Sequence, residues 1–245
     1  MKLRQRSILI TGGTSGIGAA LVSQLAGVNA EIVVIGRNPD KLDRLRQDYS
    51  NVTPYRCALD SRQAVERTIE TILARHPSLS VVINNAAVQY TPTLLDAEFS
   101  FASIENEITT NLTAPIWISA LLLGHFQALQ QNAAVINITT GLALFPKTTS
   151  AVYCATKAGL HFFSRSLRYQ LEATRISVHE AIMPLVDTAM TADRDGGKMT
   201  APAAAAAIIR GVERDRAEFH VGKARLIPVI ARISPALMGR IMKTG

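Results

Sequence analysis

The 245-residue sequence has few cysteines, few aromatic residues and no long apolar run. Cys57 and Cys154 cannot build a disulfide framework, and no Cys/His spacing of the zinc type occurs, so we predict no metal site. No run reaches the roughly 18 apolar residues of a membrane-spanning helix, and the apolar stretch after Met1 is too short for a signal peptide. We therefore expect a protein of the reducing cytosol.

Basic residues outnumber acidic ones, but the excess lies at the two ends of the chain. The formal net charge is +7, and both residues 1–6 and residues 223–245 carry Lys and Arg without any Asp or Glu. The body between these ends is close to neutral. Aromatic residues make up only 5% of the chain, too few for the base-stacking platforms of nucleic-acid-binding proteins. We expect no nucleic-acid partner.

Short apolar runs rich in β-branched residues alternate with longer segments of helical periodicity. The predicted strands are 7–11, 31–36, 53–60, 80–86, 134–140, 176–182 and 218–222. The predicted helices are 15–28, 39–49, 61–76, 98–130, 152–173 and 200–215. This alternation is typical of a parallel sheet covered on both faces, because each parallel connection needs a crossover. The sequence predicts a doubly wound α/β fold, with residues 1–245 in a single domain.

Two segments depart from this alternation. Residues 187–200 contain paired glycines and lack an apolar period, which predicts a mobile flap over a site. Residues 225–245 place aliphatic side chains between basic ones, with Pro228 and Pro235 interrupting the helical pattern. We favour a C-terminal lid or packing segment there and expect no contact with a membrane surface. The alternative is a basic amphipathic segment that touches a membrane or an apolar substrate.

A glycine-rich turn directly follows the first predicted strand and opens the first predicted helix. Such a turn aims free backbone N–H groups and the positive helix end at a phosphate, so it predicts a dinucleotide site. The candidate residues are Gly12, Thr14, Ser15, Gly16, Ile17 and Gly18. The second predicted strand ends at Arg37 and not at an acid that would accept from the 2′-hydroxyl of NAD. Because its forked donors suit a 2′-phosphate, Arg37 favours NADP(H) over NAD(H).

Tyr153 and Lys157 are four residues apart in a segment of helical periodicity, which places them on one face of a helix. The phenol of tyrosine has a pKa of about 10 and must exchange a proton near neutrality to act as an acid or base. One ammonium at about 4 Å supplies about 4 kcal/mol at an effective dielectric of ~20, enough to bring that pKa to about 7. The pair therefore predicts a proton-transfer site in which Lys157 lowers the pKa of Tyr153.

Together these features resemble the short-chain dehydrogenase/reductase family. The matching segments follow the family's order through about residues 7–190: TGGTSGIG at 11–18, Asp60, Asn84-Asn85-Ala86, Asn111, the hydroxyl-bearing strand 137–140, Tyr153 with Lys157, and Val186 with Thr188. Stretches such as VYCATKAGL and PLVDT are similar to a bacterial subgroup named after the D-alanyl-lipoteichoic-acid gene cluster. The resemblance implies a seven-stranded parallel Rossmann sheet with strand order 3-2-1-4-5-6-7.

The resemblance also implies the roles of individual residues. Tyr153 is the acid/base, and Lys157 also holds the nicotinamide ribose. Thr140 orients the substrate carbonyl, and Asn111 positions a water that links Lys157 to solvent. On the cofactor side, Asp60 accepts from the adenine, Asn85 and Ala86 line the ribose, and Thr188 reaches the nicotinamide amide.

The implied activity is an NAD(P)(H)-dependent interconversion of a small-molecule alcohol with its ketone or aldehyde. The alternative is a dinucleotide-binding sensor or scaffold with little turnover. Three departures from the family pattern bear on that choice: Thr140 replaces a serine, Ala87 replaces a glycine, and Met183-Pro184 replaces Pro-Gly. The resemblance further implies a homodimer or homotetramer paired through the helices near 98–130 and 152–173.

The sequence also suggests which residues surround the substrate. We expect a mixed apolar pocket with few charges, which disfavours a strongly anionic substrate, lined by Gln89, Tyr90, Leu144, Phe145, Met183 and Met190. Cys154, despite adjoining Tyr153, is interpreted as a packing thiol. The five histidines are scattered along the chain, and we assign them surface or capping roles.

Overall fold

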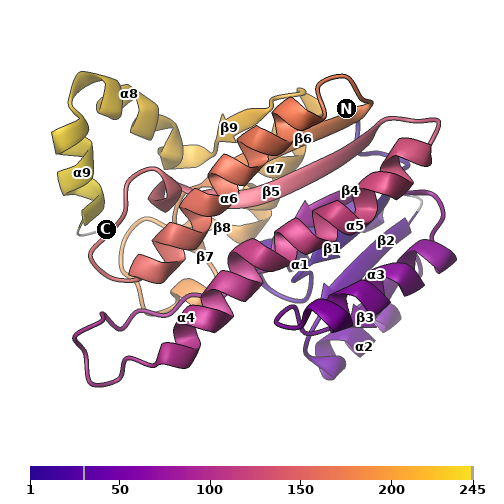
Figure 1. The fold of residues 1–245 in the computed structure, drawn as a ribbon, viewed down its shortest axis with the longest axis horizontal. Helices are drawn as coiled ribbons and strands as arrows, with labels where there is room; N and C mark the ends of the chain where they lie inside the picture. Colours follow the sequence, from indigo (N-terminus) through magenta and orange to yellow (C-terminus); the bar gives the residue numbers. More distant parts are fainter. Residues whose placement is uncertain (30, 244–245) are drawn as a thin grey trace.

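The computed structural model describes residues 1–29 and 31–243. Its main sheet has seven parallel strands in the order β3-β2-β1-β4-β5-β6-β9, which confirms the predicted order, since β9 is the seventh predicted strand (Figure 1). The strands are β1 (Ser7–Thr11), β2 (Glu31–Gly36), β3 (Val52–Arg56), β4 (Leu79–Asn84), β5 (Ala133–Thr140), β6 (Ile176–Met183) and β9 (Glu218–His220). All seven main-sheet strands overlap their predicted ranges, although β3 ends at Arg56, four residues early.

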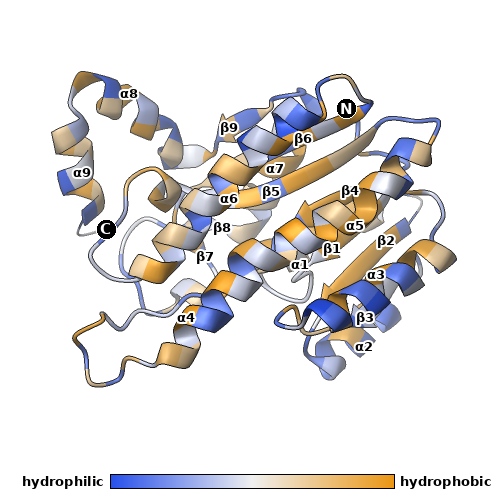
Figure 2. Ribbon diagram, viewed as in Figure 1, coloured by the Kyte–Doolittle hydropathy of each residue, from blue (hydrophilic) through white to orange (hydrophobic). Residues whose placement is uncertain are grey.

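Helices cover both faces of this sheet. The helices of the described residues are α1 (Gly16–Ala26), α2 (Pro39–Asp48), α3 (Arg62–Arg75), α4 (Phe101–Ile108), α5 (Ala114–Ala128), α6 (Ala151–Gln170), α7 (Ala201–Glu213), α8 (Leu226–Ile233) and α9 (Pro235–Lys243), of which α8 and α9 lie beyond the sheet. One core joins the sheet to α1, α2 and α7, and a second joins it to α3, α5 and α6. Figure 2 shows the strands mostly apolar, as expected for a sheet buried on both faces.

Strand β1 illustrates how the sequence builds both cores. Its five residues are all buried, and successive side chains of an extended strand point to opposite faces. Ile8 and Ile10 accordingly belong to the core beneath α1 and α7, whereas Leu9 belongs to the core beneath α3 and α5. Strand β1 therefore needs a continuous apolar run, because helices cover both faces of the sheet and each side chain packs against one of these two helix layers.

The long predicted helix 98–130 consists of three pieces. Helix α4 is followed by one π-helical turn (Thr109–Thr113) and then by α5. The π-helical segment contains one residue more than an α-helical turn would. Asn111 therefore points in a different direction from the one that regular α-helical spacing predicts. Helical periodicity alone does not reveal such an insertion.

The predicted flap 187–200 is tied at both of its ends. The short strands β7 (Val186–Asp187) and β8 (Met199–Thr200) pair in parallel as a separate two-stranded sheet. A capping box of Thr188 and Thr191 then closes a short 3-10 turn at the start of the flap. This tether was not predicted from sequence, because two-residue strands leave no periodic signal.

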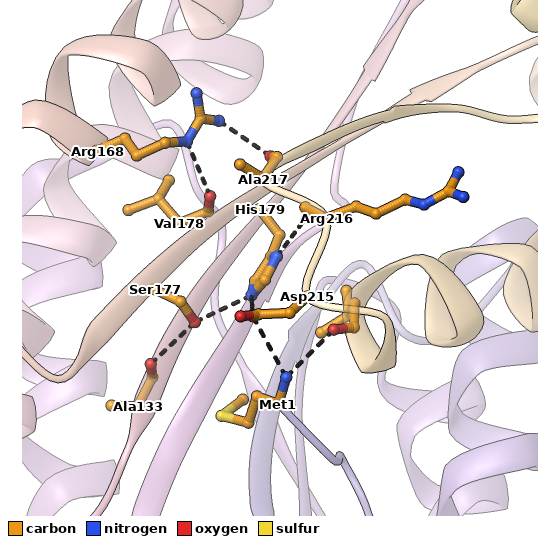
Figure 3. Close-up of polar contacts among 10 residues, drawn as sticks. Met1, Ala133, Arg168, Ser177, Val178, His179, Asp215, Arg216 and Ala217 are labelled. Carbon is orange, nitrogen blue, oxygen red and sulfur yellow. Dashed lines mark hydrogen bonds and ion pairs between the residues drawn. The ribbon is translucent and has the colours of Figure 1, made fainter. Parts of the chain in front are cut away.

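Polar contacts connect the chain's first residue to the end of α7 and the turn before β9, at the amino ends of the strands (Figure 3). The Met1 ammonium lies 3.4 Å from a carboxylate oxygen of Asp215. His179, on β6, donates from Nδ1 to the Arg216 carbonyl at 2.8 Å, which leaves Nε2 to accept from Ser177 at 2.9 Å. His179 is buried, which corrects the expected surface or capping role for this histidine.

Helices α8 and α9 lie beyond β9 at one end of the molecule (Figure 1). Pro228 lies in the first turn of α8 and Pro235 begins α9, positions where proline is tolerated, so the prolines start the helices and do not break them. Within the described residues, no helix is long and apolar enough to cross a membrane.

Candidate active site

A cavity of about 1120 Å³ opens at the carboxyl ends of the parallel strands. Open α/β sheets bind ligands at these carboxyl ends, because a crevice forms where the strand order reverses and neighbouring crossovers lie on opposite faces of the sheet. The predicted site residues that line it are Gly12, Thr14, Ser15, Gly16, Ile17, Arg37, Asp60, Asn85, Ala86, Thr140, Tyr153, Lys157 and Thr188. Gly18 and Asn111 are not part of its wall.

The glycine turn between β1 and α1 leaves no room for side chains. Gly12 has φ +67° and Gly16 has φ +52°, conformations that L-residues rarely adopt. A Cβ on Gly12 would approach Ala86 Cα to 2.9 Å, and one on Gly18 would approach the Gly12 carbonyl oxygen to 2.1 Å. Gly18 therefore permits the close packing of the turn on α1 and does not line the cavity.

The amino end of α1 opens into this cavity without a side-chain cap. Ser15 is the N-cap residue in extended conformation, its hydroxyl makes no capping bond, and the first turn contains no acidic residue. The free N–H groups and the positive helix end are thus available to an anion. This cradle of glycines and uncapped N–H groups fits a pyrophosphate.

Thr11, which the sequence did not single out, holds the neighbouring strand end against the turn. Its hydroxyl accepts from the backbone N–H groups of Asn85 and Ala86, both at 3.0 Å. The Asn85 amide returns a hydrogen bond to the Thr11 carbonyl at 3.0 Å. These contacts fix the ends of β1 and β4 relative to one another at the middle of the cavity floor.

Arg37 and Asp60 both border the cavity on the side of α2. Arg37 follows the last residue of β2 and is exposed, and Asp60 lies in the turn before α3. The methyl group of Thr14 packs against Gly36, the residue before Arg37. A Cβ on Gly36 would come within 2.9 Å of this methyl group. The sequence-based placement of a guanidinium at this strand end agrees with the structure.

Tyr153 and Lys157 extend from the first turns of α6 into the cavity. The Lys157 ammonium lies 5.7 Å from the centroid of the Tyr153 ring and donates to the Ile138 carbonyl at 3.0 Å. Burial lowers the pKa of Lys157 to about 8, and the nearby Glu180 carboxylate opposes that shift. Burial also raises the pKa of Tyr153 above its ordinary value, with Arg194 acting against it. The ammonium of Lys157 is bonded to the Ile138 carbonyl and is not among the groups that shift this pKa here, so the proposed effect of Lys157 on Tyr153 stays a prediction.

Two other predicted catalytic residues occupy different surroundings. Thr140 ends β5 at the cavity wall, and its hydroxyl accepts from the Leu142 N–H at 3.4 Å. Asn111 is fully buried, and its amide both accepts from Val88 N–H and donates to the Val88 carbonyl, each at 2.8 Å. Asn111 also donates to Thr156 at 3.3 Å, one residue before Lys157. Its contacts in this structure hold the segment after β4 against α6.

A buried acid behind Lys157 was missed by the sequence analysis. Glu180 is fully buried on β6, accepts from Thr139 at 2.6 Å and lies 2.9 Å from His161 Nδ1. This pairing raises the pKa of His161, which is buried and not the surface or capping residue we expected. Together with Glu218, these two residues bring potential ligand atoms within 4.8 Å of one another. An acid inside a predicted strand of the buried sheet is the sequence signal that could have identified Glu180.

The substrate side of the cavity differs from the predicted lining. Gln89, Met183 and Met190 contribute to the wall, as expected. Tyr90 does not, and its hydroxyl instead accepts from Asn106 at 2.6 Å. Leu144 and Phe145 also do not; they pack against the cluster beneath α8 and α9.

The expectation of few charges is also wrong. Lys147, Arg194, Lys198 and Lys223 all line this side of the cavity. Arg194 reaches across from the flap and donates to Gln89 at 2.7 Å.

Comparison with known proteins agrees with this geometry. Residues 6–198 match the family model described as short chain dehydrogenase. The chain belongs to the short-chain dehydrogenase/reductase family. It is 36% identical over 195 residues to the uncharacterized oxidoreductase DltE of Bacillus subtilis, a match that covers 78% of this chain and 75% of that protein.

Solved structures of other family members share the whole fold. A short chain dehydrogenase from Burkholderia cenocepacia, in complex with NADP, superposes with a TM-score of 0.89 at 19% identity and full coverage of both chains. A short-chain dehydrogenase/reductase from Burkholderia phymatum, in complex with NAD, superposes with a TM-score of 0.86 at 16% identity and covers 100% and 97% of the two chains. At these identities the likeness establishes the fold alone.

Proposed function

We propose that this chain is an NADP(H)-dependent oxidoreductase that interconverts a small-molecule alcohol with its ketone or aldehyde. The observation that carries the proposal is the position of Tyr153 and Lys157 in the same cavity wall as the uncapped glycine turn. The turn accommodates the cofactor pyrophosphate, and Arg37 faces the adenosine 2′-phosphate. When bound, the nicotinamide supplies or accepts the hydride.

The chain's own residues then handle the proton and the substrate oxygen. With its raised pKa, the Tyr153 phenol is protonated at neutral pH and can donate to the oxygen of a carbonyl during reduction. Thr140 lies on the same wall, where its hydroxyl can donate a hydrogen bond to that oxygen. Lys157, charged below a pH of about 8, stabilises the negative charge that develops on Tyr153 as the proton leaves.

The decisive test compares Tyr153→Phe with the wild type, using NADPH and a panel of ketones and aldehydes. We expect kcat/KM to fall at least ~100-fold while NADPH affinity, measured by calorimetry, is unchanged. Tyr169→Phe, on the exposed side of the same helix, is the matched control and should retain wild-type turnover. Equal turnover by wild type and Tyr153→Phe would refute the assignment of the acid.

The same experiment separates the enzyme from the alternative sensor or scaffold. Tight NADPH binding by the wild type without turnover across the panel would favour the sensor. We further propose that the protein works in the cytosol as a homodimer or homotetramer. The free, buried thiols of Cys57 and Cys154 are compatible with a reducing compartment.

A further inference from the structure

Helices α8 and α9 expose an aliphatic surface that the rest of the molecule does not cover. Each helix carries large side chains that are between 47% and 80% exposed, namely Leu226, Val229, Ile233, Leu237 and Ile241. Their spacing of three, four and seven residues gathers them on one face of each helix. Ile227 of α8 and Met238 of α9 are buried and pack against the protein.

Positive charge borders this aliphatic surface. Helical geometry places Arg225 and Arg232 about 40–60° around α8 from Val229, and Arg240 about 60° around α9 from Leu237. Figure 2 shows apolar and charged residues side by side along both helices. Residues 219–245 contain no Asp or Glu, so nothing within the segment neutralises these cations.

This combination restricts what can cover the surface. A second copy docked face to face would bring two uncompensated basic segments together, which is unfavourable. A nucleic acid would match the charge, but the exposed side chains are aliphatic and provide no stacking platform. A bilayer with anionic headgroups satisfies both properties, because aliphatic side chains enter the acyl boundary while arginines remain among the headgroups.

The cavity opens on the same surface. Leu226 and Ile241 are exposed and at the same time line the cavity, and Ile230 and Met242 line it from the inner side of the two helices. A surface covering α8 and α9 would therefore lie at the cavity mouth.

We propose that α8 and α9 form an interfacial docking site for an anionic lipid bilayer, which brings the cavity mouth to the membrane surface. The sequence alone favoured a lid that touches no membrane; the exposure of the aliphatic stripe changes that expectation. The proposal does not depend on the proposed function, because docking is measured without turnover.

The test is co-sedimentation of the full-length protein with vesicles of phosphatidylcholine, with or without one quarter phosphatidylglycerol, at 50 mM salt. We expect partitioning into the anionic vesicles at least ~10-fold above that into neutral ones, falling when salt is raised to 0.5 M. The variant R232Q/R240Q/K243Q should bind about 100-fold more weakly, since each basic residue near an anionic surface contributes roughly fivefold. The variant V229S/I233S/L237S, which keeps every charge, should bind at least ~10-fold more weakly.

Matched controls separate docking from general electrostatic attraction. R44Q/R67Q/R75Q removes the same charge from α2 and α3, at the opposite end of the molecule, and should bind vesicles like the wild type (Figure 1). Absence of wild-type binding to anionic vesicles at 50 mM salt would overturn the proposal. Equal losses of vesicle binding in R44Q/R67Q/R75Q and in R232Q/R240Q/K243Q would also overturn it.

Light scattering of the same variants tests whether a second copy of the chain, and not a membrane, covers this surface. A particle mass that halves in V229S/I233S/L237S, but not in R44Q/R67Q/R75Q, would show that a second copy covers this surface and would overturn membrane docking. Should the serine variant fail to fold by circular dichroism, the exposed glutamine substitutions still test the proposal, because they remove no buried atom.

Discussion

The ammonium of Lys157 lies 5.7 Å from the ring centroid of Tyr153 and is bonded to the carbonyl of Ile138, a strand residue. Lys157 is therefore held by the sheet and buried away from solvent, and this burial lowers its pKa to about 8. The fully buried Glu180 carboxylate is the charge that opposes this decrease. The charge state of Lys157 near neutrality thus depends on a residue outside the cavity wall.

The first prediction concerns the pH dependence of carbonyl reduction. Because Lys157 must be protonated, kcat should fall as pH rises through about 8. Glu180→Gln removes the charge that keeps the ammonium protonated, so the fall should occur at lower pH, as measured by a pH–rate profile and by 13C NMR of the Lys157 Cε. Glu218→Gln, at an exposed residue of the edge strand β9, is the control and should leave both profiles in place. An unchanged profile in Glu180→Gln would contradict the proposed coupling.

The second prediction concerns the choice of cofactor. Arg37→Glu places an acid where a guanidinium would face the 2′-phosphate, so it should repel NADPH and accept the 2′-hydroxyl of NADH. We expect the ratio of kcat/KM for NADPH over NADH to fall at least ~10-fold. Arg44→Glu makes the same charge change on α2 outside the cavity and should keep the wild-type ratio. Identical ratios in the two variants would remove the argument for Arg37.

The third prediction concerns the contribution of Asn111 to the stability of the fold. Asn111→Ala leaves the half-buried N–H and carbonyl groups of Val88 without their side-chain partner, and we expect a loss of about 1–3 kcal/mol in the free energy of unfolding. Thr113→Ala, in the same π-helical turn, removes one hydroxyl bond and should cost less than about 1 kcal/mol. Urea denaturation measures both losses, and a wild-type midpoint for Asn111→Ala would contradict the prediction.

The fourth prediction is a loss of stability in mild acid caused by His179. Burial lowers the pKa of His179, so below pH ~6.5 the unfolded chain binds a proton that the folded one does not. The free energy of unfolding should therefore decrease between pH 6.5 and the folded-state pKa, by at most about 1.4 kcal/mol per pH unit from this residue. In denaturation curves at pH 7.5 and 5.5, His179→Asn should lose less stability than the wild type.

His161 provides a control of opposite sign for that experiment. Glu180 raises the pKa of His161, so its stabilising contribution is present below its unfolded-state pKa and is lost as pH rises through its folded-state pKa. Relative to the wild type, His161→Asn should be more destabilised at pH 5.5 than at pH 7.5. The same pH response in both variants would contradict the opposite signs assigned to the two residues.

The fifth prediction concerns oligomerisation through α6. Phe162 and Tyr169 are seven residues apart on one helical face, and both are about two-thirds exposed. If this face pairs copies of the chain, Phe162→Glu should dissociate the assembly in sedimentation velocity experiments. Leu95→Glu, a more exposed apolar residue in the loop before α4, should leave the sedimentation coefficient unchanged. Dissociation by Leu95→Glu, or an intact assembly in Phe162→Glu, would contradict pairing through α6.

How much could be predicted depends on how local the underlying physics is. The glycine turn was predictable, because only glycine tolerates the positive φ at residues 12 and 16. The shared face of Tyr153 and Lys157 follows from helical spacing. By contrast, no local sequence pattern predicted the pairing of β7 with β8 or the π-helical turn that contains Asn111. Both depend on contacts between segments far apart in the chain.

The amino-acid sequence by itself determined the alternation of strands and helices, the turn that fits a pyrophosphate, and the type of residue at each strand end, because these follow from backbone preference and periodicity. Only the tertiary structure decided which groups meet. It placed Glu180 behind Lys157, brought Lys147 and Arg194 into the cavity, and left one face of α8 and α9 uncovered. Burial and charge proximity, which set pKa values and docking surfaces, arise between residues whose separation in sequence says nothing about their distance in space.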